Sequence, residues 1–217
     1  FTFFVVYGRV NHLVELDKVQ VLERDFPLLT PKEVNASVRK QLRRPLVVVG
    51  ACIGTDAHTV GIDAILNVKG FAGEKGLEYY DSIEVHNLGA QVSVPELVAC
   101  AGEVHADAVL VSQVVTQRDA HLHNTQELTA AFREAFPRAR RPLIVVGGPR
   151  FDESMAEELG VDRIFGKGTT PGEVASYLVS RLAKQSSSLY SNNLLRLTEE
   201  LCKTKDGVIN VNMDDDA

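Results

Sequence analysis

The feature that most constrains the fold is an alternation that runs from Pro45 to Lys184. Five short runs rich in Val, Ile and Leu are separated by five segments in which apolar residues recur at helical spacing. The apolar runs show little polar alternation, which is typical of parallel strands that are buried on both faces. The pattern therefore predicts an α/β fold, a doubly wound parallel five-stranded sheet with helices on its faces. The predicted strands are 45–53, 82–89, 107–115, 141–148 and 161–168, and the predicted helices are 61–74, 94–105, 124–136, 152–160 and 171–184.

The same pattern divides the chain into three parts. Residues 45–184 have the size of one domain. Residues 1–44 are expected to form a small N-terminal α+β element, in which FTFFVVYGRV is strand-like. A helix in this element begins after Thr30, with proline at its first position and glutamate at its third. Residues 185–217 begin with a Ser- and Asn-rich stretch and end in MDDDA, which is typical of a flexible tail.

Composition argues against two classes of partner. The 217 residues carry 23 Lys and Arg against 29 Asp and Glu, and no basic stripe is visible, so we expect no nucleic-acid binding. No apolar run approaches the ~20 residues of a membrane span, so we expect no membrane partner. The opening FTFFVVYG lacks the basic leader of a signal peptide. Three scattered cysteines without a CxxC pair indicate a reducing, cytoplasmic compartment.

Polar and glycine-rich turns follow the predicted strands. Ligands of open parallel sheets bind beyond the carboxyl ends of the strands, where glycines let the backbone approach closely. The turn after the first strand runs from Asp56 to Gly61, and the later strand ends supply further candidates, Ser112, Gly147, Gly148, Gly166 and Gly168. The sequence therefore predicts a ligand-binding edge made of these turns.

His58, in the first of these turns, is a candidate metal ligand. Asp56 lies two residues earlier and can hold one ring nitrogen, which leaves the other nitrogen free, as in many metal-binding histidines. One histidine does not make a zinc site, but it suffices as a single axial ligand to a metal held in a macrocycle. The alternative is that Asp56 caps a helix and His58 binds nothing. The compatible turns elsewhere favour the ligand.

Lys69 stands where the next helix is expected to carry an apolar residue. Ile62, Ile65, Leu66 and Lys69 share one face of a helix that begins near Gly61. Burial favours the neutral amine of a lysine, which forms Schiff bases with carbonyl compounds. The alternative is that the stem packs on this face while the ammonium reaches water at the helix end. The spacing by itself favours this second interpretation.

Together these motifs resemble a known family. The cobalamin-binding domain of adenosylcobalamin-dependent mutases and of methionine synthase has a D-x-H-x-x-G turn, a serine in the third strand and a glycine pair, here Asp56, His58, Gly61, Ser112, Gly147 and Gly148. The longer string GTDAHTVGIDAILNVKGFAGEKGLEYYDSIEVHNLGAQV, with LVSQVVTQRDAHLHN after it, is similar to the small (β) subunits of lysine 5,6-aminomutases. D-ornithine 4,5-aminomutase carries a related domain. The resemblance is close over 45–184 and loose over 1–44, and it does not extend to 185–217.

The resemblance implies a role for each of these residues. His58 is expected to be the lower axial ligand of cobalt, and Asp56 to hydrogen-bond it. The nucleotide tail of adenosylcobalamin is expected to enter the edge of the sheet, where the cofactor-binding residues are Thr59, Gly61, Ser112, Gly147, Gly148, Gly166 and Gly168. Many relatives carry proline between the last two glycines, where this chain has Lys167. Lys69 stands at the position where the aminomutases attach pyridoxal 5′-phosphate covalently.

The implied activity is that of an isomerase. It is a radical 1,2-shift of an amino group on D-lysine or β-lysine, which needs a large (alpha) subunit with a catalytic barrel that this domain is too small to contain. Residues 1–44 are expected to pair two small subunits. Three alternatives stay open: a D-ornithine 4,5-aminomutase type of subunit, a corrinoid methyl carrier that does not use Lys69, and a non-catalytic cobalamin-sensing module.

Overall fold

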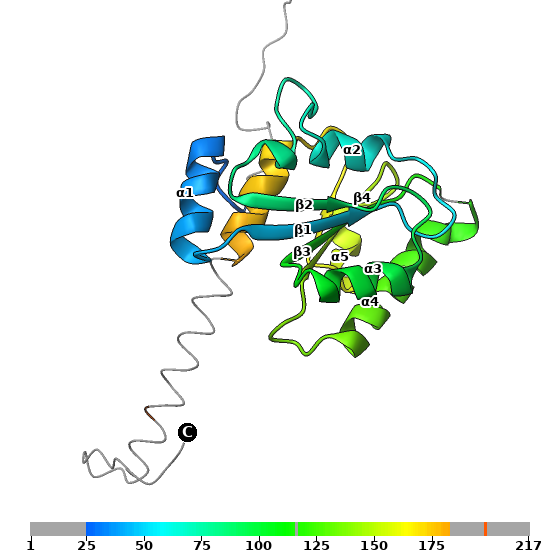
Figure 1. Cartoon of the computed structure of the whole chain (residues 1–217). Coiled ribbons are helices and arrows are strands. Elements are labelled where there is room, and N and C mark those ends of the chain that lie inside the picture. The colour runs from blue at the N-terminus through cyan, green and yellow to red at the C-terminus, as the bar shows by residue number, and fades with distance from the viewer. Residues whose placement is uncertain (1–24, 116, 183–197, 199–217) are drawn as a thin grey trace, which may run out of the picture.

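The computed structural model of the chain describes residues 25–115, 117–182 and 198. The predicted five-stranded parallel sheet is confirmed, and all five strands lie within their expected ranges (Figure 1). The strands follow the order β2-β1-β3-β4-β5, so the direction of winding reverses between β1 and β3. Their bounds are β1 Leu46–Ala51, β2 Ile83–Asn87, β3 Ala108–Ser112, β4 Leu143–Gly147 and β5 Arg163–Phe165.

Helices cover both faces of this sheet. On one face lie α1 (Pro31–Gln41), α2 (Val60–Leu66) and a helix over residues 171–182. On the other lie α3 (Val94–Glu103), α4 (Ala120–Ala135) and α5 (Ala156–Leu159), which are on the opposite side of the strands in Figure 1. Short 3-10 turns complete the described elements, η2 (Leu77–Tyr79), η3 (Gln117–Asp119) and η4 (Glu153–Met155).

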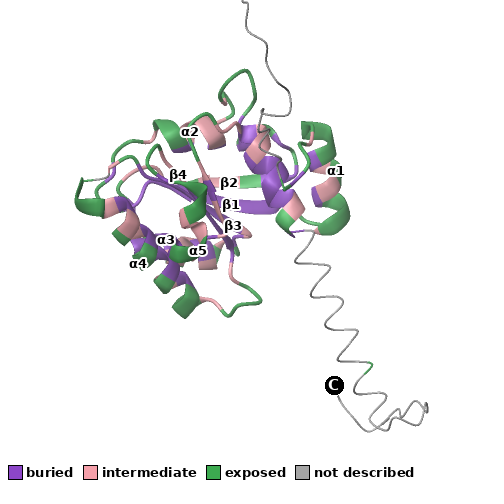
Figure 2. Cartoon of the chain, turned by 180° about the vertical axis from the view of Figure 1, so that it is seen from behind, coloured by how far each residue is buried: buried purple, intermediate pink, exposed green. Residues whose placement is uncertain are grey.

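Two apolar clusters, one on each face, hold these layers together. Successive side chains of a strand point to opposite faces, so Leu46 and Val48 enter one cluster while Val49 and Ala51 enter the other. The central strands β1 and β3 are buried throughout. The edge strand β2 is only partly buried, as Figure 2 shows. This burial explains why the central runs lack polar alternation.

The helix predicted after Thr30 is confirmed as α1. The Thr30 side chain accepts from the backbone N–H of Glu33, and the Glu33 side chain accepts from the backbone N–H of Thr30, which completes a capping box. Phe26 and Val34 are buried in the same cluster as β1, so the described part of the predicted 1–44 element packs directly on the sheet domain. Its role in pairing two small subunits stays a prediction. Residues 1–24 and the tail predicted over 185–217, Thr198 excepted, lie outside the described residues.

Three helices differ from their predicted bounds by more than two residues. In the segment predicted over 152–160, the α-helix covers Ala156–Leu159 only, after the 3-10 turn η4. The helix predicted over 61–74 ends at Leu66, because Asn67 adopts an extended backbone with φ −63° and ψ 140°. The helix predicted from residue 124 begins earlier, at Ala120, directly after Asp119 in the left-handed region. Among the residues that the structure describes, the helices all fall short of the length and hydropathy that a membrane-spanning helix needs.

Candidate cobalamin and pyridoxal phosphate site

The predicted site residues after β1, β3, β4 and β5 lie at the carboxyl edge of the sheet. Here the turn from Asp56 to Thr59 leads into α2, beside the point where the winding direction reverses between β1 and β3. That point is where open α/β sheets bind their ligands. The topology thus brings together residues that are more than one hundred positions apart in the sequence, from Asp56 to Gly168.

Asp56 is buried at this edge and accepts hydrogen bonds with both carboxylate oxygens. Its side chain is 2% exposed. Oδ2 accepts from the backbone N–H groups of Val114 (2.5 Å) and Val115 (3.0 Å), which follow β3. Oδ1 accepts from the backbone N–H of His58 at 2.9 Å and contacts the ring Nδ1 of His58 at 2.7 Å. The carboxylate therefore ties the turn after β1 to the turn after β3.

These hydrogen bonds favour the ionised form of Asp56 and orient the His58 ring. Burial by itself would raise the pKa of Asp56, but the backbone donors at Val114, His58 and Val115, together with the His58 ring, outweigh it and lower the pKa below its ordinary value of 3.8. An ionised carboxylate can only accept, so Nδ1 of His58 must carry the proton that faces it. With Nδ1–H directed at Asp56, Nε2 is the ring nitrogen left to bind a ligand, and the His58 side chain is 60% exposed.

Cys52 stabilises the backbone of this turn. Its thiol is buried and donates to the backbone carbonyl of His58 over 3.3 Å. Burial and, secondarily, the charges of Asp56 and Asp63 raise the pKa of the thiol to about 11. Cys52 therefore stays protonated near neutral pH, so it acts as a structural donor and does not compete with His58 as a thiolate ligand.

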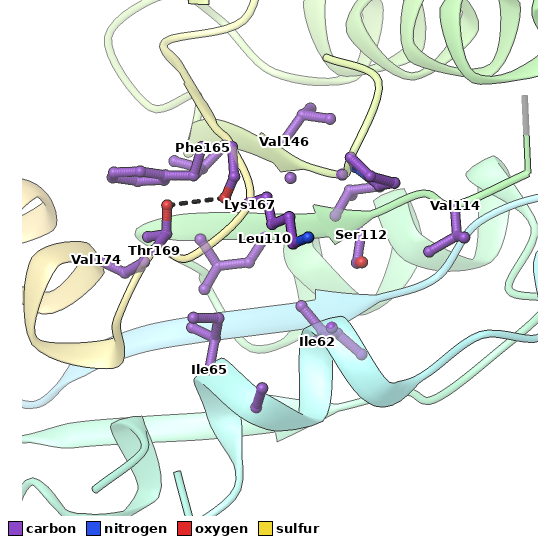
Figure 3. Close-up of a pocket in the computed structure, with 18 of the residues that line it drawn as sticks. Ile62, Ile65, Leu110, Ser112, Val114, Val146, Phe165, Lys167, Thr169 and Val174 are labelled. Carbon is purple, nitrogen blue, oxygen red and sulfur yellow. Dashed lines mark hydrogen bonds between the residues drawn. The ribbon is translucent and has the colours of Figure 1, made fainter. Parts of the chain in front are cut away.

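A cavity of about 300 Å³ opens next to this turn (Figure 3). α2 forms one wall through Ile62 and Ile65, and the ends of β3 and β4 form another. The loop after β5, residues 166–169, forms the third wall of the cavity. All but one of the predicted tail-binding residues line the cavity, namely Gly61, Ser112, Gly147, Gly148, Gly166 and Gly168. The exception is Thr59, which is half-buried between His58 and the start of α2 and makes no side-chain cap.

The lining suits the nucleotide tail of a cobalamin. Most of it is aliphatic or aromatic, which favours a flat apolar base such as dimethylbenzimidazole, and the hydroxyls of Ser112 and Thr169 add polar groups at the wall. Glycines let neighbouring segments of the wall approach each other closely. A Cβ at Gly61 would lie 2.8 Å from Oγ of Ser112, and a Cβ at Gly148 would lie 2.1 Å from the backbone oxygen of Gln113.

Gly148→Ala is expected to destabilise the fold by about 1–3 kcal/mol, because the new methyl group meets rigid backbone rather than a movable side chain. The free energy of unfolding, measured with urea, checks this expectation. Gly166→Ala is the matched control, since a Cβ there meets nothing within 4 Å. Equal stability of the two variants would contradict the tight approach at Gly148.

Lys69 lies outside α2, which corrects the helical face predicted for it. The residue is exposed and sits in a turn, so burial within this chain does not act on its amine. Asn67 makes the turn, with its side-chain Oδ1 accepting from the backbone N–H of Lys69 at 3.0 Å, and Gly70 follows with φ 69°. The spacing of this asparagine and glycine was the signal in the sequence that the helix ends early.

The loop that carries Lys69 is nevertheless held firmly. Phe71 and Glu74 exchange two backbone hydrogen bonds of 3.0 Å. The carboxylate of Glu74 accepts from the backbone N–H of Gly172 at 2.8 Å, which joins the loop to the helix after β5. Phe71 also lines the cavity. Lys69 is therefore presented to solvent from an ordered loop beside the predicted cobalamin site.

Polar side chains next to this edge of the sheet are buried and support the turn after β3. His121 of α4 is 6% exposed and packs edge-on against Phe151, with ring centroids 5.1 Å apart. Gln113, which follows β3, is fully buried, and its side chain hydrogen-bonds Thr125 and Asn124 of α4. Asn124 thus lies within α4 and supports the turn after β3.

Comparisons with known proteins agree with this geometry. A family model described as a B12 binding domain matches residues 46–175. The lysine 5,6-aminomutase beta subunit of Acetoanaerobium sticklandii is 42% identical over 188 residues, which cover 87% of this chain and 71% of that protein. Its counterpart from Fusobacterium nucleatum is 39% identical, over 85% of this chain and 70% of that protein. The D-ornithine 4,5-aminomutase subunit beta of A. sticklandii is 32% identical, over 80% of this chain but 22% of that protein.

Proposed function

The chain belongs to the lysine 5,6-aminomutase beta subunit family, and on this premise we propose that it carries adenosylcobalamin and pyridoxal 5′-phosphate for a radical 1,2-shift of an amino group on D-lysine or β-lysine. The observation that carries the proposal is the Asp56–His58 pair beside a glycine-rimmed apolar cavity. When bound, adenosylcobalamin supplies a carbon radical and pyridoxal 5′-phosphate supplies the electrophilic carbonyl that holds the migrating amino group.

His58 would hold cobalt through Nε2, and Asp56 would orient the ring. The carboxylate of Asp56 fixes the tautomer of His58 and makes its Nε2 a stronger electron-pair donor to a metal. The hydrogen bonds of Asp56 to the backbone of Val114 and Val115 hold the carboxylate, and with it the imidazole ring, in place. The cavity between α2 and the ends of β3 and β4 would receive the nucleotide tail. Its apolar walls exclude water from the base, and Ser112 offers a hydroxyl next to Gly61.

Lys69 would tether pyridoxal 5′-phosphate through its amine. Its exposure matters here, because the amine has to reach a cofactor that is shared with a second protein. The relatives are named as beta subunits, which supports a separate large alpha subunit, and this subunit would supply the barrel that binds the phosphate and the substrate. The order of the Lys69 loop limits the search that the amine makes for its carbonyl partner.

Borohydride trapping on the complex of both subunits tests the proposal. The complex is loaded with pyridoxal 5′-phosphate, reduced and digested, and the modified peptide is mapped by mass. A pyridoxyl group on Lys69 is expected in the wild type, and none is expected at this position in Lys69→Arg. Lys75→Arg is the matched control, because Lys75 is an exposed lysine of the same loop and its replacement should leave the trapping unchanged. A complex that binds cobalamin but leaves Lys69 unmodified would indicate a corrinoid carrier.

A further inference from the structure

One charged side chain, that of the exposed residue Lys167, borders the otherwise uncharged cavity. Among the described residues that line it, Lys167 alone carries a charge, and the lining includes no carboxylate. Figure 3 shows the Lys167 side chain reaching into the cavity in the direction of Ser112. Lys167 is exposed, and its ammonium makes no hydrogen bond or ion pair with residues 25–115, 117–182 and 198. A cation at an apolar wall is stabilised when a ligand brings an anion to it.

Hydrogen bonds hold the loop that carries Lys167 in a defined conformation. Thr169 donates its hydroxyl hydrogen to the backbone oxygen of Gly166 over 3.0 Å, which closes the loop around Lys167. Thr170 and Glu173 cap each other's backbone N–H groups at the start of the helix over 171–182. The position of the lysine backbone is therefore set before any ligand arrives.

The flanking glycines leave room on the cavity side of this loop. A Cβ at Gly166 or at Gly168 would meet nothing within 4 Å, and Gly168 has φ 90°, a conformation that suits glycine. A ligand backbone can therefore run along the loop within reach of the Lys167 ammonium. An apolar slot with one cation at its rim fits an aromatic base that is joined to a single phosphodiester.

The geometry points to Lys167 as the residue that recognises the phosphodiester of the cobalamin nucleotide tail, so that this chain selects complete cobalamins over corrinoids that lack the tail. The inference rests on the proposed function and names the part of the cofactor that the cavity recognises. The contact is a charge-assisted hydrogen bond, in which the ammonium donates to a phosphate oxygen. A backbone N–H group in the same place would carry no such charge, so the lysine would strengthen the contact with an anionic group.

The test compares two probes on the full chain, adenosylcobalamin and adenosylcobinamide, which has the same upper ligand but no nucleotide tail. Binding is followed by equilibrium dialysis with detection of the corrin absorbance. Lys167→Met, which keeps the length and removes the charge, is expected to weaken adenosylcobalamin binding about tenfold and to leave adenosylcobinamide binding unchanged. Lys167→Arg is expected to bind adenosylcobalamin as the wild type does. Added salt should weaken the wild type and not the methionine variant.

The outcomes separate this inference from the proposed function. If Lys167→Met lost affinity equally for both probes, the substitution would have disturbed the loop. If it lost affinity for neither probe, Lys167 would stay in solvent. Either result overturns the inference, while cobalamin binding by the chain stands. A wild-type chain that binds neither probe would overturn the proposed function, and this inference with it.

Discussion

His58→Ala is expected to abolish histidine ligation of cobalt and to weaken adenosylcobalamin binding by more than the roughly 10–100-fold that follows from losing an outer partner of a metal ligand. The imidazole would be the protein's only bond to the metal, so nothing else in the turn replaces it. Its thiol neighbour Cys52 stays protonated because its pKa is raised to about 11. The fold is expected to survive, because the His58 side chain is largely exposed and Asp56 keeps its three backbone donors.

Electron paramagnetic resonance of the bound, reduced cobalt(II) form measures this ligation directly. A histidine nitrogen on cobalt splits each cobalt line into a triplet, and labelling the protein with nitrogen-15 histidine converts the triplets to doublets. Wild type is expected to show this conversion, and His58→Ala is expected to show no splitting from the protein label. His123→Ala is the matched control, because it removes an exposed histidine from α4. Label-dependent splitting that persists in His58→Ala would assign cobalt to another histidine.

The sheet was predictable because burial on both faces leaves a strong trace in the sequence. A run such as LVVVGA has no polar face, so it is compatible with a central strand and with little else of that length. The order of the strands was not predictable in this way, since β1 pairs with both β2 and β3 through contacts that no local pattern encodes. Helix ends were predictable where side chains make the cap, as at Thr30, and not where left-handed residues begin α4.

In the site, too, contacts between residues close in the sequence were predictable, and contacts between distant residues were not. The contact of Asp56 with His58 spans two residues, so the sequence predicts it. The backbone donors at Val114 and Val115 that keep the carboxylate ionised come from a turn nearly sixty residues away, and only the fold brings them there. Lys69 shows the opposite error, because a helical spacing placed it on a face that the Asn67 turn removes.

Asp56→Asn is expected to lower the free energy of unfolding by about 2–4 kcal/mol, which is the largest stability effect that we expect at this site. Each oxygen of the carboxylate accepts two hydrogen bonds, one pair from the backbone of Val114 and Val115 and the other from His58. An asparagine can offer only one oxygen, so in either orientation its amide nitrogen faces two donors. Asp63→Asn is the matched control, because Asp63 accepts from Asn87 at the surface of α2 and its replacement should cost little.

The pH dependence of this difference follows from the lowered pKa of Asp56. A carboxylate whose pKa falls below its ordinary value of 3.8 on folding stabilises the folded state above that value, and it loses this contribution as the pH falls through the folded pKa. The gap in stability between wild type and Asp56→Asn should therefore be largest near neutral pH and shrink in acid. Urea unfolding of both proteins from neutral pH to about pH 3 measures it. A gap that stays constant across this range would show that Asp56 is not the ionised acceptor on which the orientation of His58 depends.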